Sequence, residues 1–150
     1  MTNYPETKPI IYNRKTETHN MKPENTTPKG MMITGWILSA IAILFLLFDG
    51  AAKLVKPDFV VKATKELGYP ESSIVPIGLL IVISVIIYII PRFAVIGGIL
   101  VTACLGGAIA THIRLQNPLF THILFPVYLG IFIWGGLYLR NAQFRKLIRS

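Results

Sequence analysis

Ionisable residues at the ends of long apolar segments are the side chains of this sequence that could do chemistry. Asp49 follows one apolar run, His112 lies near the end of another, and His122 lies early in the last one. Ionisable groups are costly at membrane depth, so they commonly mark a proton path or a ligand site. Two imidazoles and a carboxylate could relay protons or hold a polar headgroup. Asp49, His112 and His122 are therefore the candidate catalytic residues.

Three further polar residues belong to the same predicted end of the molecule. Lys53, Arg114 and Tyr69 are candidate ligand-binding residues, because each adjoins the end of an apolar run or the segment between two runs. A structural explanation is the alternative. In it, Asp49 pairs with Lys53 one helical turn later and the histidines bond to loop carbonyls. Two histidines and a carboxylate also form a known metal ligand set, but they lack the helical spacing of such ligands, so no metal site is predicted.

The elements that must position these residues are membrane-spanning helices. Of the 150 residues, 53% are hydrophobic and 15% are charged. The apolar residues gather in runs close to the length of about 20 residues that a helix needs to cross a bilayer. They lack the alternation of barrel strands, so we predict an all-α integral membrane four-helix bundle. The uncharged runs are Met31 to Phe48, Ser72 to Pro91, Phe93 to Ile113 and Leu115 to Leu139.

The chain divides into a membrane domain and two polar tails. Residues 1–30 are rich in polar residues and are expected to be disordered, and residues 141–150 form a basic tail. The four helices are expected at about 31–52, 73–90, 93–113 and 118–139. Between the first two, Pro57 and Asp58 suit a helix start, and Gly68 suits its end. A short external helix lying in the membrane interface is predicted there.

Basic residues set the predicted orientation. With four crossings, both tails share a side with the turn at Arg92, and that side holds ten of the fifteen basic residues. The positive-inside rule then places both termini in the cytoplasm. Because the basic residues flank apolar runs, the net charge of +8 indicates lipid headgroups as partners and not nucleic acid. The ten residues are Lys8, Arg14, Lys15, Lys22, Lys29, Arg92, Arg140, Arg145, Lys146 and Arg149.

Small residues and prolines predict how the helices pack. In the third helix Ala94, Gly98 and Thr102 begin a stripe of small residues at every fourth position, which predicts that this helix is the most buried. Asn117 and Pro118 suit the cap and first position of the fourth helix. Pro126 then falls inside that helix, where a kink is expected.

Several segments resemble one family of membrane proteins. "LFLLFDGAAKLVKP" (44–57), "ELGYPES" (66–72), "YIIPR" (88–92) and "GGAIATHIRLQNPLFTHILFPVYLGIFIWGGLYLR" (106–140) resemble the DoxX-like family of small bacterial and archaeal membrane proteins, over roughly residues 33–148. The resemblance implies a four-helix membrane protein, located in the bacterial inner (cytoplasmic) membrane. It also implies a link to membrane oxidoreductase complexes, such as a thiosulfate:quinone oxidoreductase subunit. Cys104 is the only cysteine, which argues against any dithiol mechanism.

Two classes of function follow from these observations. The first is a subunit of a membrane oxidoreductase complex, with a quinone or proton site at the outer face and a redox partner subunit. The second is a small transport, lipid-binding or structural protein without catalysis, acting alone or as a homo-oligomer. The sequence contains no nucleotide-binding loop, serine elbow or zinc helix, so no reaction is assigned and no cofactor other than quinone is suggested.

Overall fold

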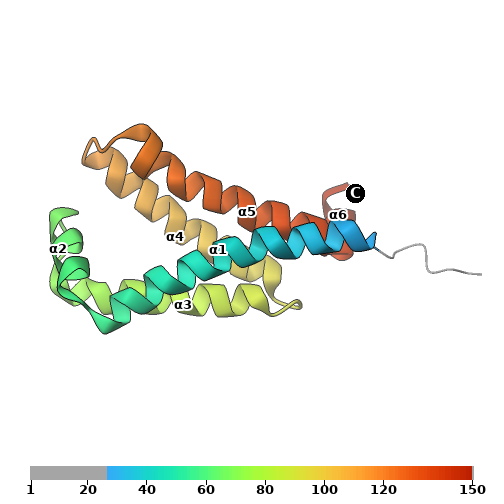
Figure 1. Ribbon diagram of the computed structural model, residues 1–150, viewed down its shortest axis with the longest axis horizontal. Helices are drawn as coiled ribbons and strands as arrows, with labels where there is room; N and C mark the ends of the chain where they lie inside the picture. The colour runs from blue at the N-terminus through green and yellow to red at the C-terminus, as the bar shows by residue number, and fades with distance from the viewer. Residues whose placement is uncertain (1–26, 150) are drawn as a thin grey trace, which may run out of the picture.

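Four long apolar helices form the body of the protein in the computed structural model, which describes residues 27–149 (Figure 1). Each of the four is long and apolar enough to cross a membrane. The described residues contain no strand, so the predicted all-α four-helix bundle is confirmed. The predicted disordered tail falls largely on residues outside the described range. The elements in chain order are α1 (Lys29–Val55), α2 (Asp58–Glu66), η1 (Glu71–Ser73), α3 (Ile74–Ile89), α4 (Ala94–Arg114), the π turn η2 (Leu119–Ile123), α5 (Leu124–Arg140) and α6 (Ala142–Arg149).

The short helix between the first two long helices is also confirmed. Helix α2 begins directly after Pro57, whose fixed φ suits a helix start. Gly68 follows its end with φ +80°, a conformation that favours glycine. In the described part of the chain, Lys62 forms no ion pair with Asp58 or Glu66, its acidic neighbours one turn away on α2. Instead, Lys56 and Lys65 lie 3.9 and 3.1 Å from Glu71 of the following turn.

The long helices contact one another in a closed ring, in the order α1, α3, α4, α5. Helix α1 changes its packing partner along its length, from α5 near its start to α3 near its end. Gly35 near its start lies against the backbone of α5 at Gly136, and Gly50 near its end lies against α3 at Gly78. Toward the end of the bundle that carries α2, α1 and α3 therefore separate from α4 and α5, as Figure 1 shows. We call this end the α2 end, and the opposite end, with the 90–93 turn and α6, the tail end.

Helix α4 shares the highest buried share with α3 and is more buried than α1 and α5, so it is not the single most buried helix that the packing prediction expected. The stripe of small residues packs only at its beginning, where Ala94 and Gly98 are buried. Further along, Thr102 is exposed, and a Cβ added at Gly106 or Gly107 would meet nothing within 4 Å. The reason is that α1 packs on α5 at its start and on α3 at its end, and so does not cover this face of α4.

A buried hydrogen-bond network joins three of the helices. Tyr88 of α3 is fully buried, and its hydroxyl donates to the carbonyl of Ile133 on α5 at 2.7 Å. The Ser39 hydroxyl of α1, also fully buried, lies 3.0 Å from the hydroxyl oxygen of Tyr88 and donates to it. Each hydroxyl hydrogen has an acceptor, as buried polar groups require where no water can serve.

Candidate functional site

The two histidines meet at the α2 end. His112 lies in the last turn of α4 and His122 in the π turn that precedes α5. Their ring centroids are 5.3 Å apart, with the ring planes inclined by 58°. The short connection between α4 and η2 brings the rings together, because it leaves the chain little room to separate the two ends. The predicted proximity of the two histidines is thus present in the structure.

Each imidazole is held by one neighbour through Nδ1. The Asn117 side-chain amide nitrogen lies 2.8 Å from His112 Nδ1, and the Thr121 hydroxyl lies 2.7 Å from His122 Nδ1. Since an amide nitrogen only donates, Nδ1 of neutral His112 is the acceptor and its proton resides on Nε2. Neither Nε2 atom has a hydrogen-bond partner among residues 27–149. His112 is half-buried and His122 is exposed, so a ligand can reach the pair.

The backbone before α5 differs from the prediction in a way that shapes this site. Asn117 does not cap the fourth helix, because its side chain turns back to His112, and Pro118 occupies the cap position. Pro126 lies inside the continuous helical segment Leu119–Arg140, as predicted, and the wide π turn η2 directly precedes the turn of α5 that contains it. A π turn accommodates an interrupted hydrogen-bond ladder, and such turns are frequent at functional sites. His122 belongs to this turn.

Asp49 lies apart from the histidines. Its carboxylate pairs with Lys53 at 2.5 Å, one turn later on α1, and neither histidine is among its hydrogen-bond or ion-pair partners in the described part of the chain. In Figure 1 the C-terminal part of α1 lies beside α2 and α3, whereas the turn between α4 and α5 lies on the other side of the separation. The structure therefore joins two of the three candidate catalytic residues and leaves the third in the predicted structural pair with Lys53.

The remaining ligand-binding candidates hold α2 against α4. Nη2 of Arg114 donates to the carbonyl of Leu67 at 2.7 Å. The Tyr69 hydroxyl lies 2.7 Å from Oγ1 of Thr111, which in turn donates to the carbonyl of Gly107. These bonds cross the separation between the two helix pairs at the α2 end. Arg114 and Tyr69 consequently fix the loop beside the histidines, and Lys53 is occupied by Asp49.

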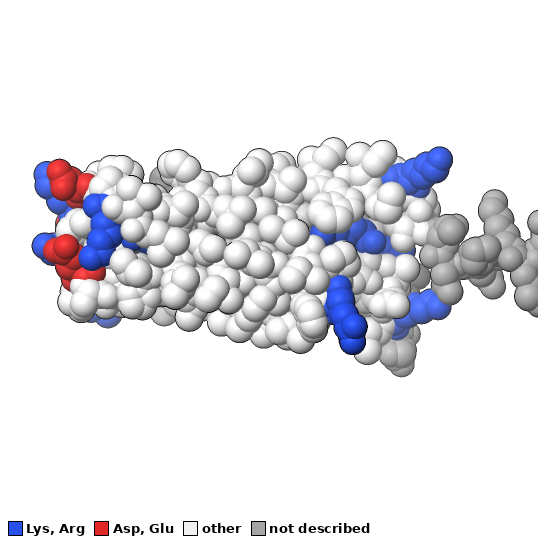
Figure 2. Space-filling view, turned by 90° about the horizontal axis from the view of Figure 1, so that it is seen from below, with Lys and Arg blue, Asp and Glu red and all other residues white. Residues whose placement is uncertain are grey.

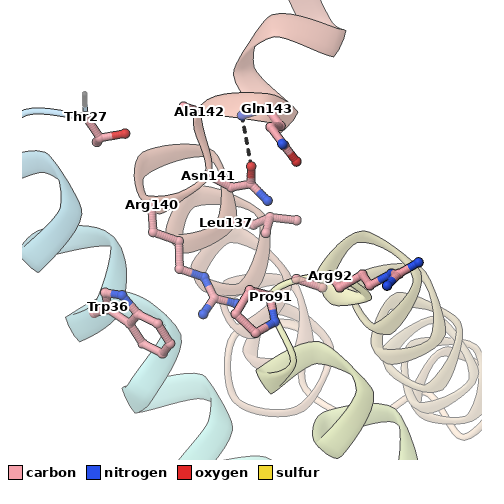
Figure 3. A pocket seen from close by; sticks show the side chains of 10 residues that line it. Thr27, Trp36, Pro91, Arg92, Leu137, Arg140, Asn141, Ala142 and Gln143 are labelled. Atoms are coloured by element: carbon pink, nitrogen blue, oxygen red, sulfur yellow. Dashed lines mark hydrogen bonds between the residues drawn. The ribbon is translucent and has the colours of Figure 1, made fainter. Parts of the chain in front are cut away.

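Charge is distributed unevenly between the two ends (Figure 2). The acidic residues of the described chain all lie toward the α2 end, where they mix with lysines and Arg114. The described charged residues of the tail end are all basic. Among them is Arg140, which stacks on two aromatic rings and lines an open pocket (Figure 3). Sequence reasoning counted Arg140 as a membrane-edge cation only, because nothing in the sequence pairs it with the aromatic residues of other helices.

The described residues include no group of three histidine, cysteine or acidic side chains that could hold a metal ion. Asp49, the carboxylate of the candidate ligand set, pairs with Lys53 and lies apart from the two histidines. Without Asp49, the site offers a ligand the two imidazole rings of the histidine pair.

Four apolar helices of membrane-spanning length, closed in a ring with polar side chains at both ends, define a multi-pass integral membrane protein. Within that class, the chain belongs to the DoxX-like family, whose model matches residues 37–136. The match covers all four long helices in whole or in large part, the histidine pair and Asp49. Comparison with curated proteins and with solved structures gave no match.

Proposed function

We propose that this protein is the membrane subunit of an oxidoreductase complex and that His112 and His122 bind the headgroup of a quinone and handle its protons. The observation that supports this role is the histidine pair itself. Two imidazole rings are oriented through Nδ1 and present Nε2 at the edge of the bundle. In this proposal the α2 end is the outer face of the bacterial inner membrane, and both termini are cytoplasmic.

The chemistry of the pair suits a quinone carbonyl. The Nε2 proton of neutral His112 is a hydrogen-bond donor for such an oxygen, and reduction of the ring to a quinol takes up two electrons and two protons. His122 is the exposed member of the pair and connects the oxygen to water. The electrons come from a partner subunit. Asp49 has no role in the site, because its charge is compensated by Lys53.

Purification with native lipids tests this function. The wild-type protein, His112→Ala, His122→Ala and Asp49→Asn are isolated in mild detergent, and the extracted lipid is assayed for quinone. We expect quinone with the wild type and Asp49→Asn and little with either histidine variant. Cross-linking in native membranes is expected to capture a redox subunit. Absence of quinone from all preparations, together with no such subunit, would refute the role.

A structural role without catalysis is the second candidate. It is favoured by the intramolecular partners of Lys53, Arg114 and Tyr69, which leave these three predicted ligand-binding residues engaged. In that case the two histidine variants change the thermal midpoint of unfolding and leave the quinone content unchanged. The same set of preparations therefore separates the two candidates.

A further inference from the structure

The tail end carries a pocket that is separate from the histidine pair. The pocket is open, has a volume of about 500 Å³, and lies between α1, the 90–93 turn, α5 and the start of α6. Its lining includes Trp36, Arg92, Arg140, Asn141 and Gln143. Figure 3 shows Arg140 reaching from α5 to a position between Trp36 and Pro91. Residues from four segments thus surround one guanidinium group.

Arg140 is held in place by aromatic rings rather than by an acid. Its guanidinium carbon lies 4.4 Å from the ring centroid of Trp36 and 4.8 Å from that of Tyr88. Cation–π contacts of this kind fix the plane of the guanidinium. No carboxylate pairs with Arg140 within residues 27–149, because the acids of that range lie toward the opposite end of the bundle.

The hydrogen-bonding capacity of this guanidinium is largely unused. Nη2 donates to the carbonyl of Tyr88 at 3.3 Å, a long bond. Nε is buried and has no hydrogen-bond partner among the described residues. A buried donor without a partner is costly, and it is unusual enough in a folded protein to need an explanation. Nε itself is enclosed by protein, but Nη1 also has no hydrogen-bond partner among the described residues. Because Arg140 lines the open pocket, a ligand with acceptor oxygens could bind the underused Nη donors there.

The groups around the Arg140 pocket favour an anionic ligand. Arg92 also lines the pocket, and its guanidinium carbon lies 5.9 Å from the centroid of the Phe93 ring. In Figure 3 the Arg92 side chain points away from Arg140, and as an exposed side chain it can swing inward. Helix α6 begins at the pocket, with Asn141 accepting from the backbone N–H groups of Gln143 and Phe144. The positive end of that helix therefore adds to the positive potential. The planar guanidinium of arginine can donate two parallel hydrogen bonds to two oxygens of one phosphate.

From this geometry we infer that the pocket around Arg140 binds a phosphate group, as carried by an anionic phospholipid or by a soluble phosphate compound. The pocket opens beside Trp36, which is 43% exposed next to the exposed apolar side chains of Ile33 and Ile37 on α1. A phospholipid bound there places its acyl chains along this apolar surface and its phosphate on Arg140. Exposed tryptophan is typical of that depth in a bilayer.

Retention of lipid tests the first source of phosphate. The protein is reconstituted in phosphatidylcholine nanodiscs containing phosphatidylglycerol, and bound phosphatidylglycerol is counted by native mass spectrometry after release into detergent. We expect the wild type to retain phosphatidylglycerol. Arg140→Gln is expected to bind it at least about tenfold more weakly. Lys146→Gln removes the same charge from the same end without touching the pocket, and it is expected to retain lipid as the wild type does.

Inorganic phosphate tests the second source. In a Trp134→Phe background Trp36 is the remaining tryptophan, so its fluorescence reports a shift of the guanidinium above it. A response to phosphate in pure phosphatidylcholine discs, lost in Arg140→Gln, supports a soluble ligand. Lipid retention without this response supports a phospholipid. Should Arg140→Gln not fold, Arg140→Lys replaces it, because it keeps the charge and the aliphatic stem. Arg140→Lys is expected to weaken binding severalfold.

Two results would overturn the phosphate site. One is a flat response in both assays. The other is an equal loss of lipid in Arg140→Gln and Lys146→Gln, which would assign the lipid to diffuse surface charge. Neither result bears on the histidine pair at the other end, so this site and the proposed quinone role fail or stand independently.

Discussion

The hydroxyl of Ser39 lies 3.0 Å from the hydroxyl of Tyr88, and this contact joins the first and second long helices in the interior of the bundle. The Tyr88 hydroxyl donates a hydrogen bond to the Ile133 carbonyl, so one tyrosine connects α1, α3 and α5. Its ring also supports Arg140. The network therefore links the packing of the core to the pocket at the tail end.

Tyr88→Phe is expected to destabilise the protein by about 1 kcal/mol, because it leaves the buried Ser39 hydroxyl without its interhelical partner. The free energy of unfolding in mixed detergent micelles measures the effect. Tyr128→Phe makes the same chemical change at a tyrosine that is 48% exposed, and it is expected to cost little. Equal losses in the two variants would show that the buried network adds nothing.

Gly97→Ala is expected to destabilise by about 2 kcal/mol, because the added methyl group would collide with the backbone of Tyr88 where α3 and α4 meet. Gly106→Ala, on the same helix, meets nothing within 4 Å and is expected to be neutral or slightly stabilising. Unfolding in detergent compares the two substitutions. A larger cost at Gly106 would contradict the observed packing of α4 and favour the predicted central position.

The features that could be predicted from the sequence are those that the bilayer and local backbone geometry impose. Four apolar runs of spanning length leave few alternatives to four helices, and Pro57 and Gly68 mark the ends of α2 by local geometry. The histidine pair was predictable because a short connection joins the ends of α4 and η2. For Asp49, by contrast, the sequence indicated depth in the membrane but no lateral position.

Lateral position depends on how helices cross, and that information is distributed over several contacts. The crossing of α1 from α5 to α3 carries Asp49 away from the histidines, and the same crossing places Trp36 beside Arg140. The residues that cause it, such as Gly35 and Gly136, are common in membrane helices and specify no partner by themselves. The pocket at the tail end could not be predicted for the same reason.

Tyr69→Phe is expected to loosen α2, because it removes the hydrogen bond that connects the loop after α2 to Thr111. Losing about 1 kcal/mol of local stability speeds amide exchange about fivefold. Hydrogen exchange with mass spectrometry over residues 58–68 measures this change, with Tyr128→Phe as the matched control. Unchanged exchange would mean that Arg114 alone holds the helix.

Accessibility to a membrane-impermeant maleimide tests the orientation. In a Cys104→Ala background, a cysteine replacing Lys62 on α2 is expected to react in intact bacterial cells. A cysteine replacing Lys146 on α6 is expected to react only after the membrane is opened. The reverse pattern would place the α2 end in the cytoplasm and contradict the positive-inside assignment.

Quinone affinity tests the central claim most directly. A short-chain quinone is titrated into nanodiscs that contain the wild type, the His112→Ala/His122→Ala double variant or Asp49→Asn, and the dissociation constants are compared. We predict that the double variant binds at least about tenfold more weakly, because it loses the Nε2 donors, and that Asp49→Asn binds as the wild type does. Unchanged affinity in the double variant, or an equal loss in Asp49→Asn, would contradict the assignment of the site to the histidine pair.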